Sequence, residues 1–198
     1  LTDVSVNAQR FLSVAKEAGV ITMGERRLSL ADYEKSVVNL LCRRLTPHRP
    51  SVEDGVKPGV RVTYYEADAW PRTGGFAELT PVAETISPQI DLSTRKRDRM
   101  FGFLFEGVFL AHADGVYTFH LKAERGSELQ VAGETIVDST RATSSHPVLG
   151  HVALRKGWHP IQLRFREHAY NDGLVLKWAG PGTALRELAP EQVGHAER

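Results

Sequence analysis

Histidine and cysteine side chains are the first candidates for chemistry in this sequence of 198 residues. Eight histidines are present, and His146 and His151 lie closest together along the chain. A structural zinc site usually combines one closely spaced pair of ligands with a second pair, and no such spacing or H-E-x-x-H helix occurs. Cys42 is the single cysteine, so the chain forms no internal disulfide. We therefore predict no metal site built from these residues.

Acidic residues are the second group with chemical potential. A glycosidase needs two carboxylates held about 5 to 10 Å apart on a rigid scaffold. The candidates are Glu66, Asp68, Glu106 and Asp138, and no pattern in the sequence pairs them. Ser127 follows a glycine but lacks the strand–turn–helix frame of a nucleophile elbow. We predict no catalytic residue, so this chain itself is not an enzyme, whatever the longer polypeptide around it does.

Aromatic residues could instead bind a sugar. The face of an aromatic ring packs against the C–H groups of a pyranose, a contact worth about 1 kcal/mol by analogy with aromatic pairs. Trp70 stands beside Pro71 in an expected loop, so we predict an exposed side chain that contacts ligand. Tyr64 and Tyr65 are alternatives, but alternation along their strand sends one of them into the core.

Composition and charge exclude some classes of partner. Hydrophobic residues make up 41% and charged residues 25%, an ordinary globular mixture with a formal net charge of +1. The basic cluster at residues 95–99 is interrupted by Asp98 and is not the broad basic stripe with interleaved aromatics of a nucleic-acid binder, so we predict no nucleic-acid partner. No apolar run approaches the roughly 20 residues that cross a bilayer.

The N-terminal part of the chain suggests a larger protein. The chain begins with Leu1 and carries no signal-peptide pattern, so we expect a fragment of a longer polypeptide with any export signal upstream. Residues 1–50 show helical periodicity, ended by Pro47 and Pro50. Two short amphipathic helices cannot bury both apolar faces against each other. We expect them to dock on the second half, on an upstream catalytic domain or on a protein partner.

After a predicted linker at residues 51–58, the hydrophobic period changes from helical to two. The expected strands are 60–65, 101–109, 115–122, 128–131, 135–138, 151–155, 159–166 and 173–178. Turn signals rich in glycine, aspartate and asparagine separate them. Many short strands without intervening helices predict an all-β fold, an antiparallel β-sandwich over residues 59–193, with residues 194–198 as a tail.

Six short segments of this half resemble, in order, the anthrax protective-antigen (PA-fourteen) domain family. They are residues 60–65, 105–107, 114–119, 126–129, 154–161 and 178–182. Residues 76–82 resemble the leader of copies attached to bacterial β-N-acetylhexosaminidases, sulfatases and similar glycan-processing enzymes. The resemblance implies a non-catalytic, carbohydrate-associated accessory module. It would belong to a larger secreted bacterial enzyme or surface protein and lie outside the cytoplasm, in the periplasm or at the cell surface.

The resemblance also implies a binding region. Lectin-like members bind sugar through calcium, which is held by two adjacent aspartates and by an asparagine or aspartate of a later loop. These positions fall on Glu124 and Arg125, and on Asn171 and Asp172. Arg125 places a positive charge where the ion would sit, and a site that loses a carboxylate binds calcium more weakly.

Two interpretations of these positions stay open. Glu124, Asn171 and Asp172 are predicted ligand contacts, although the Asn171-Asp172-Gly173 sequence also suits a hairpin turn without any ligand. We predict no cofactor, and calcium is disfavoured. The leading function is glycan binding or docking. The alternative is a protein-interaction or assembly domain whose calcium-dependent sugar site has degenerated.

Overall fold

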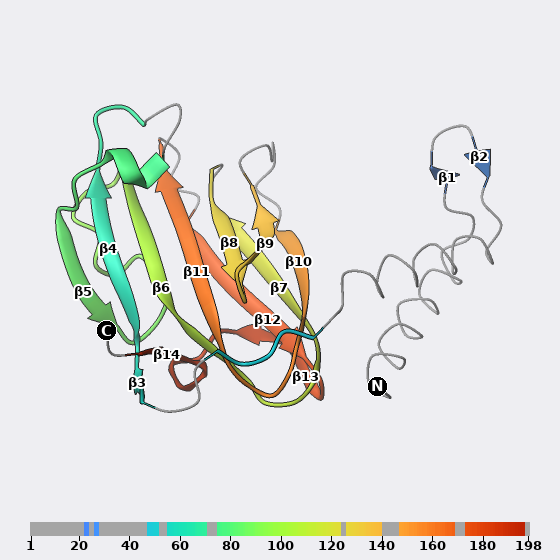
Figure 1. Ribbon diagram of the computed structural model, residues 1–198. Coiled ribbons are helices and arrows are strands. Elements are labelled where there is room, and N and C mark those ends of the chain that lie inside the picture. The colour runs from blue at the N-terminus through green and yellow to red at the C-terminus, as the bar shows by residue number, and fades with distance from the viewer. Residues whose placement is uncertain are drawn as a thin grey trace.

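A computed structural model shows two antiparallel β-sheets packed face to face (Figure 1). It describes residues 22–23, 26–27, 47–51, 55–70, 75–123, 126–139, 147–168 and 173–196. The predicted all-β sandwich is therefore confirmed. Within these residues the helical elements are two short 3-10 helices, Gly75–Glu78 (η1) and Pro190–Gln192 (η2). The described part of the chain holds no helix long and apolar enough to cross a membrane.

The larger sheet contains eight strands. In chain order they are β3 (Val56–Pro58), β4 (Val60–Glu66), β5 (Ala83–Ser87), β6 (Phe101–Ala111), β8 (Glu128–Val131), β9 (Glu134–Asp138), β11 (Gly157–Glu167) and β14 (Val193–Ala196). Strand β6 lies in the middle: β11 pairs along one of its edges, and β4 and β14 share the other. Strand β8 continues the sheet from β11 to β9.

The smaller sheet contains four strands in the order β10, β7, β12 and β13. Their bounds are Val148–Leu154 (β10), Gly115–Ala123 (β7), Leu174–Gly180 (β12) and Thr183–Glu187 (β13). All three pairings are antiparallel. A separate antiparallel pair is formed by Thr22–Met23 (β1) and Arg26–Arg27 (β2).

The core fills the space between the sheets because every second side chain of the central strands points inward. The largest buried side chains include Phe103 and Phe105 of β6, Phe119 of β7, Phe165 of β11 and Trp178 of β12. Each buried ring of this kind stabilises the fold by about 1.5–3 kcal/mol. The sandwich is held together chiefly by this aromatic core.

Tyr64 and Tyr65 lie on opposite faces of β4, yet both are buried, with 2% and 6% of their surface exposed. Tyr64 belongs to the central core, as alternation requires of one of the two. The ring of Tyr65 packs instead against Phe76 of η1, with ring centroids 4.8 Å apart. The outer face of the larger sheet therefore carries a small second core.

The predicted linker and tail are both partly wrong. Val56–Pro58, expected in the linker, form β3 and pair with β14, which includes residues expected in the tail. The pairing brings backbones into close contact: a Cβ atom on Gly194 would lie 2.3 Å from Cγ1 of Val56. Partners more than 130 residues apart in sequence leave no local signal, and strands of three and four residues are too short to show alternation.

The predicted helices of residues 1–50 fall on 1–21, 24–25 and 28–46, which lie outside the described residues. Residues 47–50 are extended rather than helical, and His48 joins Leu154 in a parallel bridge at the edge of β10. The His48 amide donates to the carbonyl oxygen of Ala153, and the Arg155 amide donates to the carbonyl oxygen of His48, both over 3.0 Å. These residues belong to the sandwich.

Candidate functional site

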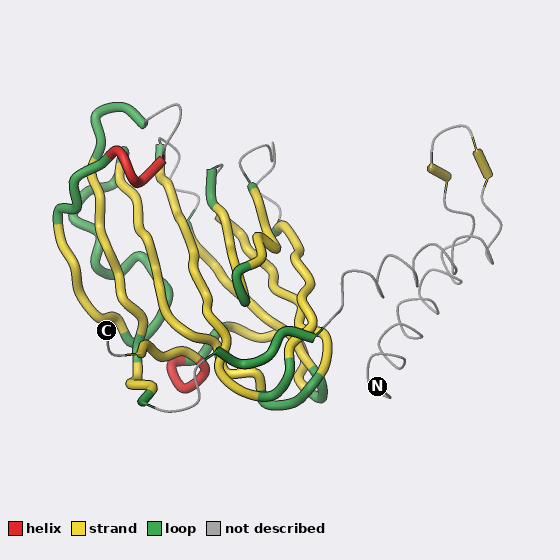
Figure 2. Tube along the Cα trace, viewed as in Figure 1, coloured by secondary structure: helices red, strands yellow, loops and turns green. Residues whose placement is uncertain are grey.

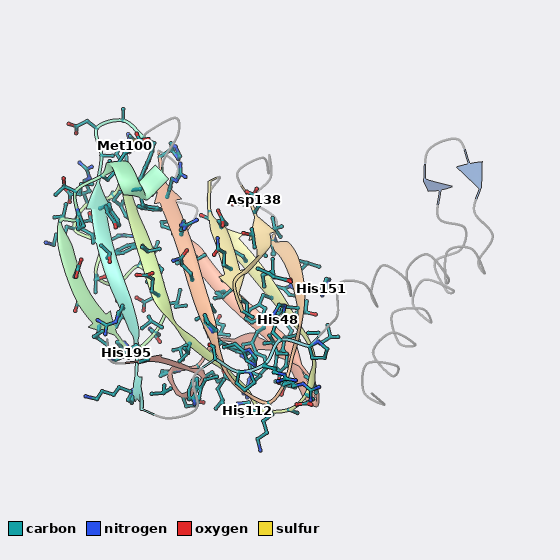
Figure 3. The ribbon with its side chains drawn as sticks, viewed as in Figure 1. His48, Met100, His112, Asp138, His151 and His195 are labelled. Atoms are coloured by element: carbon teal, nitrogen blue, oxygen red, sulfur yellow. The ribbon has the colours of Figure 1, made fainter. Side chains whose placement is uncertain are left out.

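One end of the sandwich gathers the loops in which ligand contacts were predicted. Ala123, the last residue of β7, pairs with Leu174, the first of β12, and Glu167, the last of β11, pairs with Phe101. We call this the loop end. Figure 2 shows η1 there, and Figure 3 places Met100 and Asp138 there, with His112 and His195 far from it.

The predicted contacts Glu124, Asn171 and Asp172 lie outside the described residues. Their flanking strands are described, however: Glu124 follows Ala123 and Asp172 precedes Leu174 by two positions. The described residues that flank the two predicted loops, Ala123 and Leu174, therefore lie on adjacent strands. Whether their side chains contact a ligand remains a prediction.

Two serines tie the turn after β7 to the end of β9. The buried Ser127 amide donates to Oγ of Ser139 over 3.0 Å, and that hydroxyl donates to the Ser127 carbonyl oxygen over 2.8 Å. The Ser139 amide donates to the same carbonyl oxygen over 2.9 Å. Ser127 is therefore a structural residue that positions the turn at the loop end.

Trp70 lies in a packed cluster on the outer face of the larger sheet. Its ring meets that of Phe76 edge to face at 5.7 Å, and its Nε1 donates to the Glu167 carbonyl oxygen over 3.2 Å. Both rings cover Gly102, where a Cβ atom would lie 2.6 Å from Cη2 of Trp70 and 2.7 Å from Cε1 of Phe76. Trp70 is therefore half-buried and held in place, and its contact with a ligand remains a prediction.

Arg166 and His168 complete this cluster on the side of the β7–β8 turn. The guanidinium carbon of Arg166 lies 5.7 Å from the centre of the Trp70 ring and 5.8 Å from that of Phe76, and the ring of His168 lies 5.9 Å from Trp70. A Cβ atom on Gly126 would lie 3.8 Å from Cδ of Arg166 and 4.0 Å from Cε1 of His168. We call Trp70, Phe76, Arg166 and His168 the loop-end cluster.

Calcium does not fit the described residues beside this turn. Calcium takes six to eight oxygen ligands, many of them from carboxylates. Among the described residues, the side chains within 4 Å of a Cβ placed on Gly126 are instead those of Arg166 and His168, which supply no oxygen ligand. Within the described ranges, no group of three or more histidine, cysteine, aspartate or glutamate side chains is placed to hold a metal ion. The described residues beside this turn therefore offer no calcium ligands.

The histidines have separate environments. His159 is fully buried, burial lowers its pKa, and its Nε2 lies 2.7 Å from the Arg155 carbonyl oxygen. His120 and His151 lie on the smaller sheet, where burial again lowers the pKa of each. The charge of Lys177 adds to this effect at His120, so both rings are held towards the neutral form at neutral pH.

The sequence as a whole decides the family. The PA14 domain model matches residues 57–192 of this chain, more than half of its length. The chain belongs to the PA14 domain family. This confirms the resemblance to the protective-antigen (PA-fourteen) family. A comparison with curated protein sequences finds no match.

Solved structures share the PA14 fold at low sequence identity. The PA14 domain of the antifreeze protein MpAFP has a TM-score of 0.56 at 14% identity, over 75% of this chain and 96% of that one. The epithelial adhesin 9 A domain of Candida glabrata, in complex with Galβ1-3GlcNAc, has a TM-score of 0.55 at 13% identity, over 76% and 94%.

Two further matches widen the comparison. A PA14 sugar-binding domain from an RTX adhesin has a TM-score of 0.52 at 17% identity, over 70% of this chain and 99% of that one. An anti-sigma factor domain-containing protein from Clostridium clariflavum has a TM-score of 0.57 at 18% identity, over 75% of this chain and 51% of that one. This chain thus spans about half the length of that protein.

Sequence reasoning missed three members of the loop-end cluster. The sequence pattern singles out none of Phe76, Arg166 and His168. The glycine at position 102 was a usable signal, because a glycine inside a strand often marks the close approach of another group. Which group approaches it required the structure.

Proposed function

We propose that this PA14 domain is a non-catalytic, carbohydrate-binding module that acts outside the cytoplasm as part of a larger secreted or surface protein. The observation that carries the proposal is the loop-end cluster, which holds an indole ring and a guanidinium beside the β7–β8 turn. Similar PA14 domains include one described as sugar-binding and an adhesin domain in complex with a galactosyl disaccharide. Aromatic rings and planar donors are the groups that recognise sugars.

A catalytic role is not supported by the described carboxylates. The Glu66 carboxylate accepts a hydrogen bond from the Tyr64 hydroxyl over 3.0 Å and lies 3.8 Å from Nε of Arg97. The Glu106 carboxylate accepts from the Gln162 side chain over 3.1 Å. These contacts hold Glu66 at the end of β4 and Glu106 on the outer face of the larger sheet. We propose that any reaction belongs to another domain, such as a glycan-processing enzyme.

A second candidate function is protein interaction or assembly, and the smaller sheet favours it. Leu149 of β10, Val175 of β12 and Leu185 of β13 are 50%, 37% and 46% exposed. All three strands belong to one sheet. Exposed apolar side chains gathered on one sheet are typical of a surface that another protein covers.

Glycan-array binding of the 198-residue chain, with and without calcium, tests the first proposal. We expect binding that survives a calcium chelator and falls about fivefold in a Trp70→Ala variant, because a stacked ring contributes roughly 1 kcal/mol. Trp158→Ala is the matched control, since Trp158 is half-buried and pairs with Leu110 near the opposite end of the sheet.

Failure to bind any glycan would contradict the sugar-binding proposal and leave the assembly interpretation. The assembly interpretation has its own test, a Leu149→Lys and Leu185→Lys double variant. Analytical ultracentrifugation would compare the self-association of this variant with that of the unmodified 198-residue chain. The same self-association in the variant and the unmodified chain would exclude the smaller sheet as the interface.

A further inference from the structure

Arg166 differs from the arginine two positions before it on the same strand. Arg164 and Arg166 occupy alternate, outward positions of β11, and both are half-buried. Nη1 of Arg164 lies 3.5 Å from the carboxylate of Glu128, its counter-charge on β8. Among the residues that the structure describes, no carboxylate pairs with Arg166.

The hydrogen-bonding capacity of Arg166 is also unfilled. Its Nε is buried and donates to no acceptor among the described residues, so a ligand would meet the terminal nitrogens rather than Nε. Among the described residues, the guanidinium lies against the rings of Trp70 and Phe76 in cation–π contacts. These contacts use the face of the guanidinium and leave its terminal N–H groups as donors for a ligand.

The surroundings hold this cation in place for a ligand. Trp70 and Phe76 lie within 6 Å of the guanidinium carbon, and the backbone of Gly75 approaches so closely that a Cβ there would lie 3.3 Å from a terminal nitrogen of Arg166. Stacking on aromatic rings restricts the guanidinium while it leaves the edge donors available. A donor that is fixed beforehand loses less entropy when a ligand binds.

The geometry points to an acidic saccharide as the ligand, with its carboxylate or sulfate group bound by Arg166 of the loop-end cluster. The planar guanidinium matches the two oxygens of a carboxylate or sulfate, and such charge-assisted bonds are stronger than neutral ones. The ring of His168 also lies beside Trp70, with ring centroids 5.9 Å apart. This inference rests on the proposed carbohydrate-binding function and names the class of sugar.

Matched glycan pairs test the inference on the full 198-residue chain. The probes are 6-sulfated N-acetyllactosamine with its unsulfated parent, and tetragalacturonate with its carboxyl-reduced form. We expect the acidic member of at least one pair to bind about tenfold more tightly at low salt. That preference should shrink as salt approaches 1 M, where the Debye length is about 3 Å. Inorganic sulfate alone, added as competitor, separates recognition of the sugar from recognition of a free anion.

Three variants identify the residue responsible. Arg166→Gln should abolish the preference for the acidic member, and Arg166→Lys should restore part of it, because lysine keeps the charge but not the planar donors. Arg164→Gln is the matched control and should leave the preference intact, since its charge is already paired with Glu128. Thermal unfolding of each variant confirms that it is folded.

The outcomes separate this inference from the proposed function. Equal binding of both members of each pair overturns the inference but leaves a neutral sugar-binding module. An acidic preference that survives Arg166→Gln in a folded variant also overturns it, and so does competition by inorganic sulfate at the same concentration as the glycan. Binding to no probe on a broad array overturns both proposals.

Discussion

The indole Nε1 of Trp178 donates a hydrogen bond to Oε1 of Gln192 over 2.9 Å, and both side chains are buried. Trp178 lies on β12 of the smaller sheet, and Gln192 lies in η2, directly before β14 of the larger sheet. The same oxygen accepts from the Ala189 amide over 3.1 Å. One amide thus joins the two sheets where the chain crosses between them.

Replacement of Gln192 by leucine should destabilise the domain by about 1–3 kcal/mol. The substitution leaves the indole N–H buried without an acceptor, and an unsatisfied donor costs that amount. Urea unfolding followed by Trp fluorescence measures the change. Gln162→Leu is the control: its amide donates to Glu106 on the half-buried outer face, so a smaller loss is expected. Equal losses would contradict a special role for Gln192.

Replacement of Gly102 by alanine should displace Trp70 and Phe76 and cost about 1–3 kcal/mol, as overpacking usually does. The new Cβ would also lie 2.8 Å from the Phe165 carbonyl oxygen, which cannot move without disturbing β11. Trp fluorescence should shift to longer wavelength as the Trp70 indole becomes exposed. Thr63→Ala is the control. Thr63 lies on the outward face of β4, the strand next to the β6 strand of Gly102, and its replacement should change neither stability nor spectrum appreciably. An unshifted spectrum in Gly102→Ala would contradict the packing of the loop-end cluster.

Stability should fall as the pH is lowered from 7.5 to 5. Burial lowers the pKa of His159 below its usual 6.5, so below that pH the unfolded chain binds more protons than the folded one. The stabilisation is therefore complete above pH 6.5 and is lost as the pH falls towards the lowered pKa. His120 and His151 contribute with the same sign.

A His159→Phe variant isolates this effect. Its unfolding free energy should depend less steeply on pH between 7.5 and 5 than that of the wild type. Phe109→Leu, at the buried position that pairs with His159, introduces no titrating group and should keep the wild-type slope. If His159→Phe keeps the full slope, the destabilisation in acid arises elsewhere.

Calcium should not raise the melting temperature of this PA14 domain. The side chains beside the β7–β8 turn include a guanidinium and an imidazole, and the sequence places Arg125 in the turn itself. Calorimetry at millimolar calcium and with a chelator should give the same melting temperature. A rise with calcium that disappears in Asp172→Ala would show that the later loop binds the ion after all.

The strands with strong alternation were predictable, and the others were not. Tyr117 and Phe119 alternate with polar residues, so β7 was evident from the sequence. Strands β5 and β13 are mostly exposed and lie at sheet edges, where no core selects the apolar residues. Strands β3 and β14 depend on a pairing between the two ends of the domain. Local patterns do not report contacts of that kind.

Parts of the candidate site were also predictable from the sequence, and parts were not. Motif order indicates which strands flank Glu124 and Asp172, and the contacts of these two residues stay a prediction. The loop-end cluster was hidden, because Trp70 and Arg166 are nearly one hundred positions apart and meet only where Gly102 leaves room. An indole beside a proline also looks exposed in a sequence, whereas here it rests on a strand.

The strap of residues 47–51 determines how this domain is tethered. His48 lies beside Leu154, and Leu154 pairs with Gly115, the first residue of β7. The strap therefore joins the sandwich at the end of β7 opposite to Ala123. Nε2 of His48 lies 3.1 Å from a carboxylate oxygen of Glu134. The chain therefore enters the sandwich at the pole opposite to Trp70 and Arg166. Whatever the strap joins to the sandwich, it does so without crossing the loop-end cluster.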